Sequence, residues 1–251
     1  MFESLAYIIA TFVFLLLRRR FGDSLPSTSR WIVIATTVAC AALGSKALFW
    51  FEDPTLTWQN LHDPAYLMGG KTIVGALVFG LAGVELMKRY IGLEQSTGDL
   101  YAIPLALGIA VGRIGCFLTG LPDNTYGVAT SLPWGVDFGD GLRRHPTQLY
   151  ETAFLLLIAP ILYRIMKSIR RMADSPWPQA QWRPGDAFRF FMVAYLSFRL
   201  VCDFLKPYPR MFLQLNTLQW VCVICLLYYS RDILRWLNPL FMRARSAEGT
   251  S

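Results

Sequence analysis

Long runs of apolar residues, separated by short polar segments, dominate the pattern of this 251-residue chain. A transmembrane helix needs about 20 mostly apolar residues, whereas a strand of a membrane barrel alternates apolar and polar positions. The runs here are continuous, which predicts helices, because unpaired backbone is not tolerated in lipid. We expect seven membrane helices, over approximately Glu3–Leu17, Trp31–Phe51, Tyr66–Met87, Leu100–Leu118, Glu151–Ile165, Ala187–Leu205 and Phe212–Ser230.

Composition favours the same class of protein. The apolar residues AVILMFWYC make up 54% of the chain and charged residues only 16%, against about 45–50% and about 25% in average soluble domains. These values exclude a disordered chain, a disulfide scaffold and collagen. We therefore predict an all-α integral membrane protein whose 251 residues form a single membrane domain, with a small extracytoplasmic segment at 119–150.

Basic residues are distributed unevenly between the predicted loops. The alternate loops that we assign to the cytoplasm, together with the helix ends next to them, contain 16 Lys and Arg, and the opposite loops contain four. This asymmetry predicts an outside amino terminus and a cytoplasmic carboxyl terminus, and it explains the net charge of +7 without a nucleic-acid partner. Glu3 precedes the first apolar run and Arg18–Arg20 follow it, the reverse of a cleaved signal peptide, so we expect this run to remain as a helix.

Four cations lie at least five residues inside the predicted helices: Lys46, Lys71, Arg113 and Arg199. Each is five or six residues from the helix end predicted to face outward, which is roughly 7–10 Å at about 1.5 Å per residue. A charge at mid-bilayer costs at least ~2.5–3.5 kcal/mol. Two interpretations remain open: long side chains that reach the headgroup region, or a cationic pocket for an anionic lipid headgroup. For phosphate, Arg is the better ligand because its planar fork binds two oxygens.

The sixth predicted helix presents Tyr195, Arg199 and Asp203 at spacings of four residues, and therefore on one face. This face is either a self-neutralised ion pair beside an interfacial aromatic residue or the wall of a polar substrate pocket. Glycines are frequent in the third and fourth predicted helices, which predicts close helix packing. We expect Gly112 and Gly115 to hold Arg113 rigidly in this way.

Cofactor chemistry has little support in the sequence. Cys222 and Cys225 have the C-x-x-C spacing, but the segment is apolar and lacks partner ligands. Two histidines are too few for a histidine-based metal site, and no nucleotide-binding glycine motif occurs in a suitable context. We expect neither a metal nor a cofactor.

Three blocks occur in order along the chain. They are Gly112-Arg113-Ile114-Gly115-Cys116-Phe117, then Arg144-His145-Pro146-Thr147-Gln148-Leu149-Tyr150-Glu151, and then Tyr195-x-x-Phe198-Arg199-Leu200-x-x-Asp203-Phe204. Together they resemble the motifs of bacterial prolipoprotein diacylglyceryl transferases. The resemblance implies transfer of a diacylglyceryl group from phosphatidylglycerol to the lipobox cysteine of a prelipoprotein. It also implies a multi-pass protein of the bacterial cytoplasmic (inner) membrane, whose active face points outward.

The resemblance also implies roles for individual residues. Arg113 would bind the phosphate, with Arg199 as its essential partner and Tyr195 as the third catalytic residue. We expect Arg113, Arg199, Tyr195 and Glu151 to share one pocket in which the two guanidinium groups converge. The candidates for substrate binding are Arg113, Lys71, Arg144, His145, Glu151 and Asp203. The rigid Pro146 would place Arg144 and His145 at the mouth, where we expect the His145 side chain to bond to backbone or to Glu151.

The sequence departs from the family pattern at several positions. Met68-Gly69-Gly70 stands where the family has His-Gly-Gly, and that histidine is a proposed base. Cys116 replaces the Asn of the first block, and Asp203 replaces the Glu of the third. Two functions therefore stay open: a transferase, or a non-catalytic protein or transporter that binds anionic lipid. Lys71 is a candidate third phosphate ligand, or a base if burial lowers its pKa.

Overall fold

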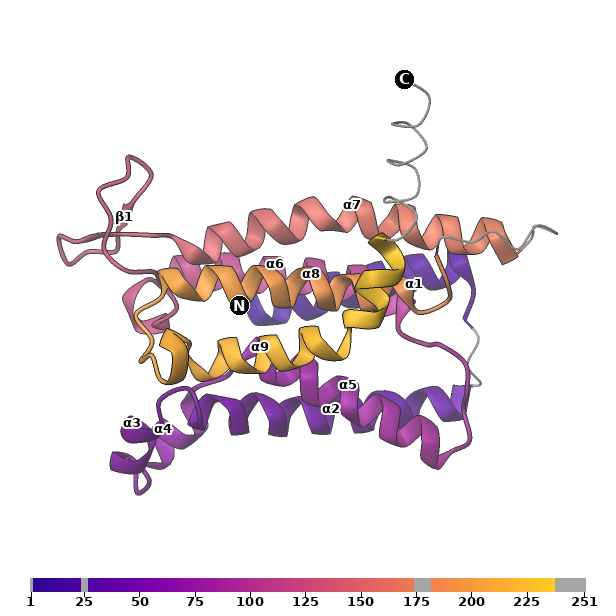
Figure 1. Ribbon diagram of the computed structural model, residues 1–251, viewed down its shortest axis with the longest axis horizontal. Coiled ribbons are helices and arrows are strands. Elements are labelled where there is room, and N and C mark those ends of the chain that lie inside the picture. The colour runs from indigo at the N-terminus through magenta and orange to yellow at the C-terminus, as the bar shows by residue number, and fades with distance from the viewer. Residues whose placement is uncertain (1, 24–26, 174–181, 238–251) are drawn as a thin grey trace. The chain divides into compact units, whose positions relative to one another are not determined.

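The computed structural model describes residues 2–23, 27–173 and 182–237, and the regular structure there is almost entirely helical (Figure 1). The α-helices are α1 Phe2–Phe21, α2 Ser27–Trp50, α3 Pro54–Gln59, α4 Pro64–Gly69, α5 Ile73–Tyr90, α6 Asp99–Thr119, α7 Thr147–Ala173, α8 Asp186–Cys202 and α9 Thr217–Tyr228. Within the described ranges, the strands are the two-residue β1 Val136–Asp137 and β2 Arg143–Arg144, which pair antiparallel in the 119–150 segment. The predicted all-α class is confirmed.

Three helices in the described part of the chain are both long and apolar enough to cross a bilayer. They cover Ser29–Trp50 of α2, Asp99–Thr119 of α6 and Thr147–Arg171 of α7. Helix α9 is apolar but has only 12 residues. These helices fit a membrane protein, whereas the count of seven spans and the orientation of the termini stay predictions.

The prediction of one continuous helix over Tyr66–Met87 is wrong, because α4 ends at Gly69 and a new helix, α5, starts at Ile73. Gly70 is extended, with φ −75° and ψ 155°. Helix α5 begins three residues later, where the Thr72 hydroxyl accepts a hydrogen bond from the Gly75 amide at 3.3 Å. The Lys46 ammonium group donates to the carbonyls of Met68 and Gly70, the latter at 2.7 Å. The Lys46 ammonium group therefore satisfies backbone carbonyl groups that have no helical hydrogen-bond partner where α4 ends.

The helix predicted from Phe212 begins at Thr217. Asn216 and Gln219 cap α9 reciprocally: the Gln219 amide donates to Asn216 Oδ1 at 2.7 Å, and the Asn216 amide donates to Gln219 Oε1 at 2.9 Å. This arrangement resembles a capping box and sets the first turn of the helix. Likewise α8 ends at Cys202, and Asp203–Leu205 form a short 3-10 turn.

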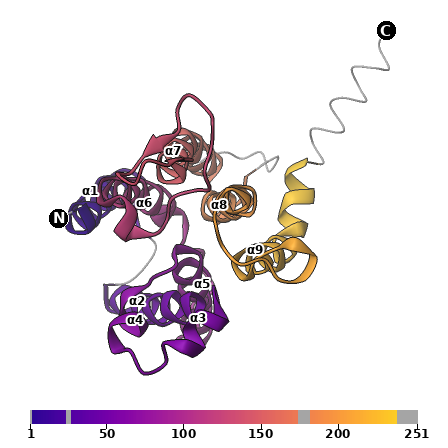
Figure 2. The ribbon, with the colours of Figure 1, turned by 90° about the vertical axis from the view of Figure 1, so that its left-hand side faces the viewer.

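The described residues form two compact units. The first includes α1, α6, α7 and most of α8. In it α1 packs on α6, and α6 packs on α7, as the end-on view shows (Figure 2). The rings of Phe154 on α7 and Phe198 on α8 stack with centroids 4.4 Å apart. Together, these contacts place α7 against both α6 and α8.

The second unit covers Asp23–Thr97 and Arg199–Val223, and α2 packs on α5 within it. Glycine makes this contact possible, since a Cβ at Gly75 would lie 2.3 Å from the carbonyl oxygen of Gly44. In the first unit, a Cβ at Gly115 would lie 2.5 Å from Phe2. The predicted close packing is confirmed at these glycines but is wrong at Gly112, where a Cβ would meet nothing within 4 Å.

Candidate functional site

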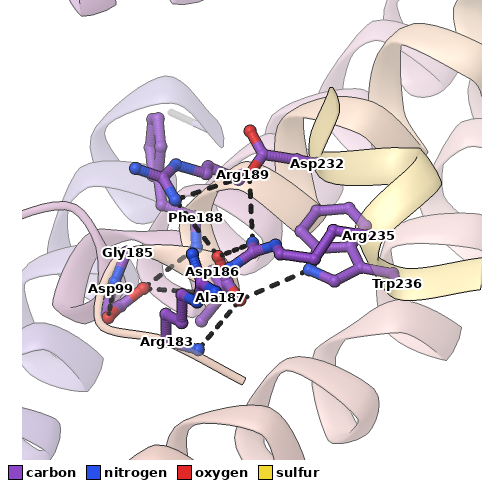
Figure 3. A network of polar contacts seen from close by, with 10 residues as sticks. All are labelled: Asp99, Arg183, Gly185, Asp186, Ala187, Phe188, Arg189, Asp232, Arg235 and Trp236. Carbon is purple, nitrogen blue, oxygen red and sulfur yellow. Dashed lines mark hydrogen bonds and ion pairs between the residues drawn. The ribbon is translucent and has the colours of Figure 1, made fainter. Parts of the chain in front are cut away.

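Helix α8 carries Tyr195 and the start of the third motif, and its amino-terminal end is anchored to α6 (Figure 3). The carboxylate of Asp99, the first residue of α6, accepts hydrogen bonds from the amides of Gly185, Ala187 and Phe188, at 2.6, 3.0 and 3.2 Å. These amides have no partner within the helix, so an anionic side chain is a favourable partner for them. Asp99 therefore fixes where α8 starts relative to α6.

A second buried carboxylate, Asp186, ties α8 to the residues that follow α9. It forms ion pairs with Arg235 at 2.6 Å and with Arg189 at 3.2 Å, and it accepts a hydrogen bond from the Trp236 indole at 3.3 Å (Figure 3). Asp186 is fully buried. A charge buried in this way is stable only when it is paired and hydrogen-bonded, so this network is structural.

The central feature of the first unit is a buried network that joins α6, α7 and α8. The Nε of Arg113 on α6 pairs with Oε2 of Glu151 on α7 at 2.9 Å. The hydroxyl of Tyr195 on α8 donates to Oε1 of the same carboxylate at 2.7 Å. The three residues are 6%, 1% and 0% exposed. Three of the four residues predicted to share a pocket are therefore in contact, whereas the pocket itself stays a prediction.

The network holds the Arg113 guanidinium group in one orientation. Both oxygens of Glu151 are engaged, one by the guanidinium group and one by the Tyr195 hydroxyl. Glu151 and Tyr195 thus orient Arg113, and the catalytic role expected of Tyr195 and the substrate-binding role expected of Glu151 stay predictions. The Nη1 atom of Arg113 also lies 3.8 Å from the sulfur of Cys116, one turn further along α6. A fixed cation in a buried, low-dielectric setting stabilises developing negative charge strongly.

Arg199 belongs to a buried cluster in the second unit. It pairs with Asp203 at 2.9 Å, and Lys206 lies 3.8 Å from the same Asp203 oxygen. All three residues are at most 3% exposed. The Arg199–Asp203 spacing was predicted to place the two on one face, and the ion pair confirms that. Convergence of Arg113 with Arg199 stays a prediction, because the two arginines belong to different units.

The Arg199 cluster contains two residues that the sequence interpretation missed. Lys206 follows the sixth predicted helix and is one of the four cations counted in the outward loops, although its spacing of three residues from Asp203 is compatible with an ion pair. Glu52, just beyond α2, accepts a hydrogen bond from Tyr208 and lies near Arg199 and Lys206. Burial raises the pKa of Glu52 above its ordinary value, in spite of these partners. Its only signal in the sequence is an acidic residue directly after a long apolar run.

Arg144 and His145 lie in the 119–150 segment, directly before α7. Arg144 pairs with Asp140 at 2.6 Å and lies 5.0 Å from the centre of the Tyr126 ring. Its hydrogen bonds hold the pKa of the Asp140 carboxyl below its usual value. The backbone of β2 supports this position, since Asp137 pairs with Arg143 in the two-stranded ladder.

The expected bond from the His145 side chain to backbone or Glu151 is wrong. Its Nδ1 lies 3.2 Å from the hydroxyl of Tyr150, which also accepts a hydrogen bond from the Trp134 indole at 2.9 Å. The partners of the Glu151 carboxylate are instead Arg113 and Tyr195. Pro146 does directly precede α7, as the sequence predicted.

Lys71 lies in the non-helical break between α4 and α5 and is exposed. Its proposed contact with phosphate stays a prediction. Among the described residues there is no group of three or more His, Cys, Asp or Glu side chains that would hold a metal ion.

Comparison with known proteins matches these motifs to one family. A family model described as prolipoprotein diacylglyceryl transferase matches residues 2–230. A phosphatidylglycerol–prolipoprotein diacylglyceryl transferase of Desulfotalea psychrophila is 32% identical over 182 residues, which is 69% of this chain and 63% of the relative. The protein of the same name from Nitrosomonas europaea is 33% identical over 199 residues, 72% of this chain and 65% of the relative.

The matches cover less than two thirds of the length of these relatives. The range matched by the family model, residues 2–230, spans all three motif blocks. The buried Arg113–Glu151–Tyr195 network is built from one residue of each block. Since the family model extends over nearly the whole sequence, the chain belongs to the prolipoprotein diacylglyceryl transferase family.

Proposed function

We propose that this protein transfers a diacylglyceryl group from phosphatidylglycerol to the thiol of a lipobox cysteine in a prelipoprotein. The observation that carries the proposal is the buried Arg113–Glu151–Tyr195 network, in which a carboxylate and a hydroxyl hold a guanidinium group in place. Membership in the family supports the same reaction, because the relatives are named for it.

In the reaction, the cysteine sulfur attacks a glycerol carbon of the lipid, and the bond from that carbon to the phosphate oxygen breaks. The thiol loses its proton to a base, and glycerol phosphate leaves with the bonding electron pair. A cysteine with a pKa of about 8.5 is only a few per cent ionised at neutral pH, so the attacking form is scarce. Arg113 would lower the barrier by stabilising the charge that develops on the departing phosphate.

The other site residues receive roles that follow from their surroundings. Arg199, one helical turn from Tyr195 on α8, is the second phosphate ligand, and Asp203 orients it. Lys71 is a third ligand for the phosphate, and Arg144 and His145 form the entrance through which the acceptor peptide approaches. Because Met68 stands in the position of the family histidine, the base is a different group in this chain.

We further propose that both units belong to one multi-pass domain of a bacterial cytoplasmic membrane. It would have seven spans, an outside amino terminus, a cytoplasmic carboxyl terminus and an active face that points outward. The uneven distribution of basic loops supports this orientation.

A second candidate function, non-catalytic binding of anionic lipid, is favoured by one observation, the missing histidine at Met68. Two assays separate the candidates: complementation of a transferase-depleted strain, and conversion of a lipobox peptide by the purified protein with phosphatidylglycerol. We expect growth to be restored and a thioether product to form, and Arg113→Gln to abolish both. Lipid binding without product, over a panel of lipobox peptides, would instead support the non-catalytic function.

A further inference from the structure

Gln148 is a buried amide without a visible partner. It is 1% exposed, and neither its Oε1 nor its Nε2 has a hydrogen-bond partner among the described residues. Gln219, the matching case, is equally buried but satisfied: its Nε2 donates to the Leu200 carbonyl at 2.9 Å, and its Oε1 accepts from the Asn216 amide. Buried polar groups are nearly always paired, and an orphaned one is costly, so Gln148 calls for a specific explanation.

The position of Gln148 relates it to the candidate site. It lies in the first turn of α7, three residues before Glu151 and four before Thr152, so these residues share one helix face. The Thr152 hydroxyl donates to the Ala110 carbonyl of α6 at 3.2 Å, and Glu151 binds Arg113 on the same helix. Gln148 thus lies on the face of α7 toward α6, about one turn, or roughly 5 Å, from Glu151.

The chemistry of the amide limits which chemical groups could be its ligand. A primary amide offers N–H donors and a carbonyl acceptor, and both ends of Gln148 are unpaired within the described residues. An ionised phosphate has only acceptor oxygens, so it would leave Oε1 unsatisfied. An alcohol hydroxyl both donates and accepts, and therefore satisfies both ends. In a phosphodiester bound by Arg113, the headgroup alcohol is attached directly to the phosphate. Its hydroxyl groups could therefore reach Gln148, which lies one helical turn from Glu151.

We propose that Gln148 binds the hydroxyl groups of the glycerol headgroup and so selects phosphatidylglycerol among anionic phospholipids. The inference rests on the proposed function, because it takes Arg113 as the phosphate ligand. Gln148 is then a specificity-determining residue: Arg113 recognises the charge that all phosphodiester lipids share, and Gln148 recognises the alcohol that distinguishes one of them.

The test compares two lipids that have the same charged phosphodiester and differ in their hydroxyls: phosphatidylglycerol and phosphatidylethanol. Affinities are measured with the purified full chain in nanodiscs. We expect the wild type to prefer phosphatidylglycerol about 10-fold, as the loss of one or two hydrogen bonds implies. Gln148→Met should remove this preference and leave the affinity for phosphatidylethanol unchanged. Because the assay measures binding, it remains informative even if the protein forms no thioether product.

Gln219→Met is the matched control, and thermal stability without added lipid is the second readout. Gln148→Met should have an unchanged or higher Tm, because it replaces an unpaired amide with an apolar group of similar size. Gln219→Met should lower the Tm and keep the lipid preference. If Gln148→Met does not fold, Gln148→Leu takes its place, and failure of both variants to fold would indicate a structural amide and overturn the proposal.

Two other results would also overturn it. One is an unchanged lipid preference in a folded Gln148→Met. The other is a change confined to the KM of the lipobox peptide, which would identify a peptide group as the ligand of this amide. By contrast, a wild type that shows the expected lipid preference and yields no thioether product would contradict the proposed transferase activity alone.

Discussion

Arg113 and Lys46 are both cations within long apolar helices, but their surroundings differ. Arg113 is 6% exposed and is held by Glu151, whereas Lys46 donates to the carbonyls of Met68 and Gly70 where α4 ends. Glu151 orients the Arg113 guanidinium group, which has further N–H donors. The Lys46 ammonium group instead has a structural role, because it bonds to two backbone carbonyls. At the scale of single residues, we therefore expect Arg113 to bind an anion and Lys46 to stabilise the end of α4.

We expect Arg113→Gln to weaken phosphatidylglycerol binding roughly 10- to 150-fold, because a charge-assisted contact contributes about 1.5–3 kcal/mol. Lys46→Gln should cause a much smaller loss of affinity. Lipid affinity in nanodiscs measures both, with circular dichroism to check that each variant folds. An equal loss, or a larger one for Lys46→Gln, would contradict the assignment of Arg113 as the phosphate ligand.

We expect Glu52 to make the stability of the second unit depend on pH. Because burial raises its pKa in the folded state, the folded protein holds this proton more tightly than the unfolded chain. The contribution of Glu52 to stability is thus full below the unfolded pKa and is lost as the pH rises through the raised folded value. Glu52→Gln, which mimics the protonated form, should match the wild type near pH 4 and become the more stable protein toward neutrality.

Thermal unfolding of Glu52→Gln and the wild type across this pH range measures the difference. The exposed Glu94→Gln is the control, and its difference from the wild type should not follow the same course. A Glu52→Gln protein that becomes less stable than the wild type as the pH rises would show that the ionised carboxylate is favoured by Arg199 and Lys206.

At the scale of elements, helix packing depends on individual glycines. Gly75 faces the backbone of Gly44 across the α2–α5 contact, whereas Gly112 has open space where a Cβ would be. Both lie inside helices. The frequency of glycine in the sequence indicates close helix packing in general. Which of the glycines lies at a close contact depends on the position of the partner helix.

Gly75→Ala should therefore destabilise the α2–α5 pair, since its Cβ would lie 2.3 Å from a carbonyl oxygen and the helices would have to separate. We expect a loss of about 1–3 kcal/mol, measured by unfolding in detergent. Gly112→Ala is the matched control and should be neutral, or more stable by about 0.5–1 kcal/mol, because alanine is the better helix former. Similar losses for both variants would attribute the effect to helix propensity or local strain instead of packing.

At the scale of the whole molecule, the charge distribution predicts which loops face outward. Single-cysteine variants without the native cysteines, labelled in intact cells with a maleimide that cannot cross the membrane, test the prediction. Asn60→Cys and Ser131→Cys should react in intact cells, and Ser96→Cys only after permeabilisation, because the short loop before α6 follows Lys88 and Arg89. Labelling of Ser96→Cys in intact cells would overturn the seven-span arrangement.

The sequence by itself determined the class of the protein and much of the site. Continuous apolar runs require helices in lipid, and three ordered motifs predict that Arg113, Glu151 and Tyr195 belong to one site. Hydrophobicity, helical spacing and the rigid Pro146 at the start of α7 are local properties. They can therefore be evaluated from neighbouring residues alone.

Only the tertiary structure decided the features that depend on partners distant along the chain. The break before α5 depends on Thr72 as a cap and on Lys46 from α2, and the start of α8 depends on Asp99 from α6. In the same way, nothing in the sequence distinguishes Gln148 from other polar residues, whereas the structure shows that its amide is buried and has no partner among the described residues. Polar satisfaction is a property of three-dimensional surroundings, so no pattern along the sequence contains it.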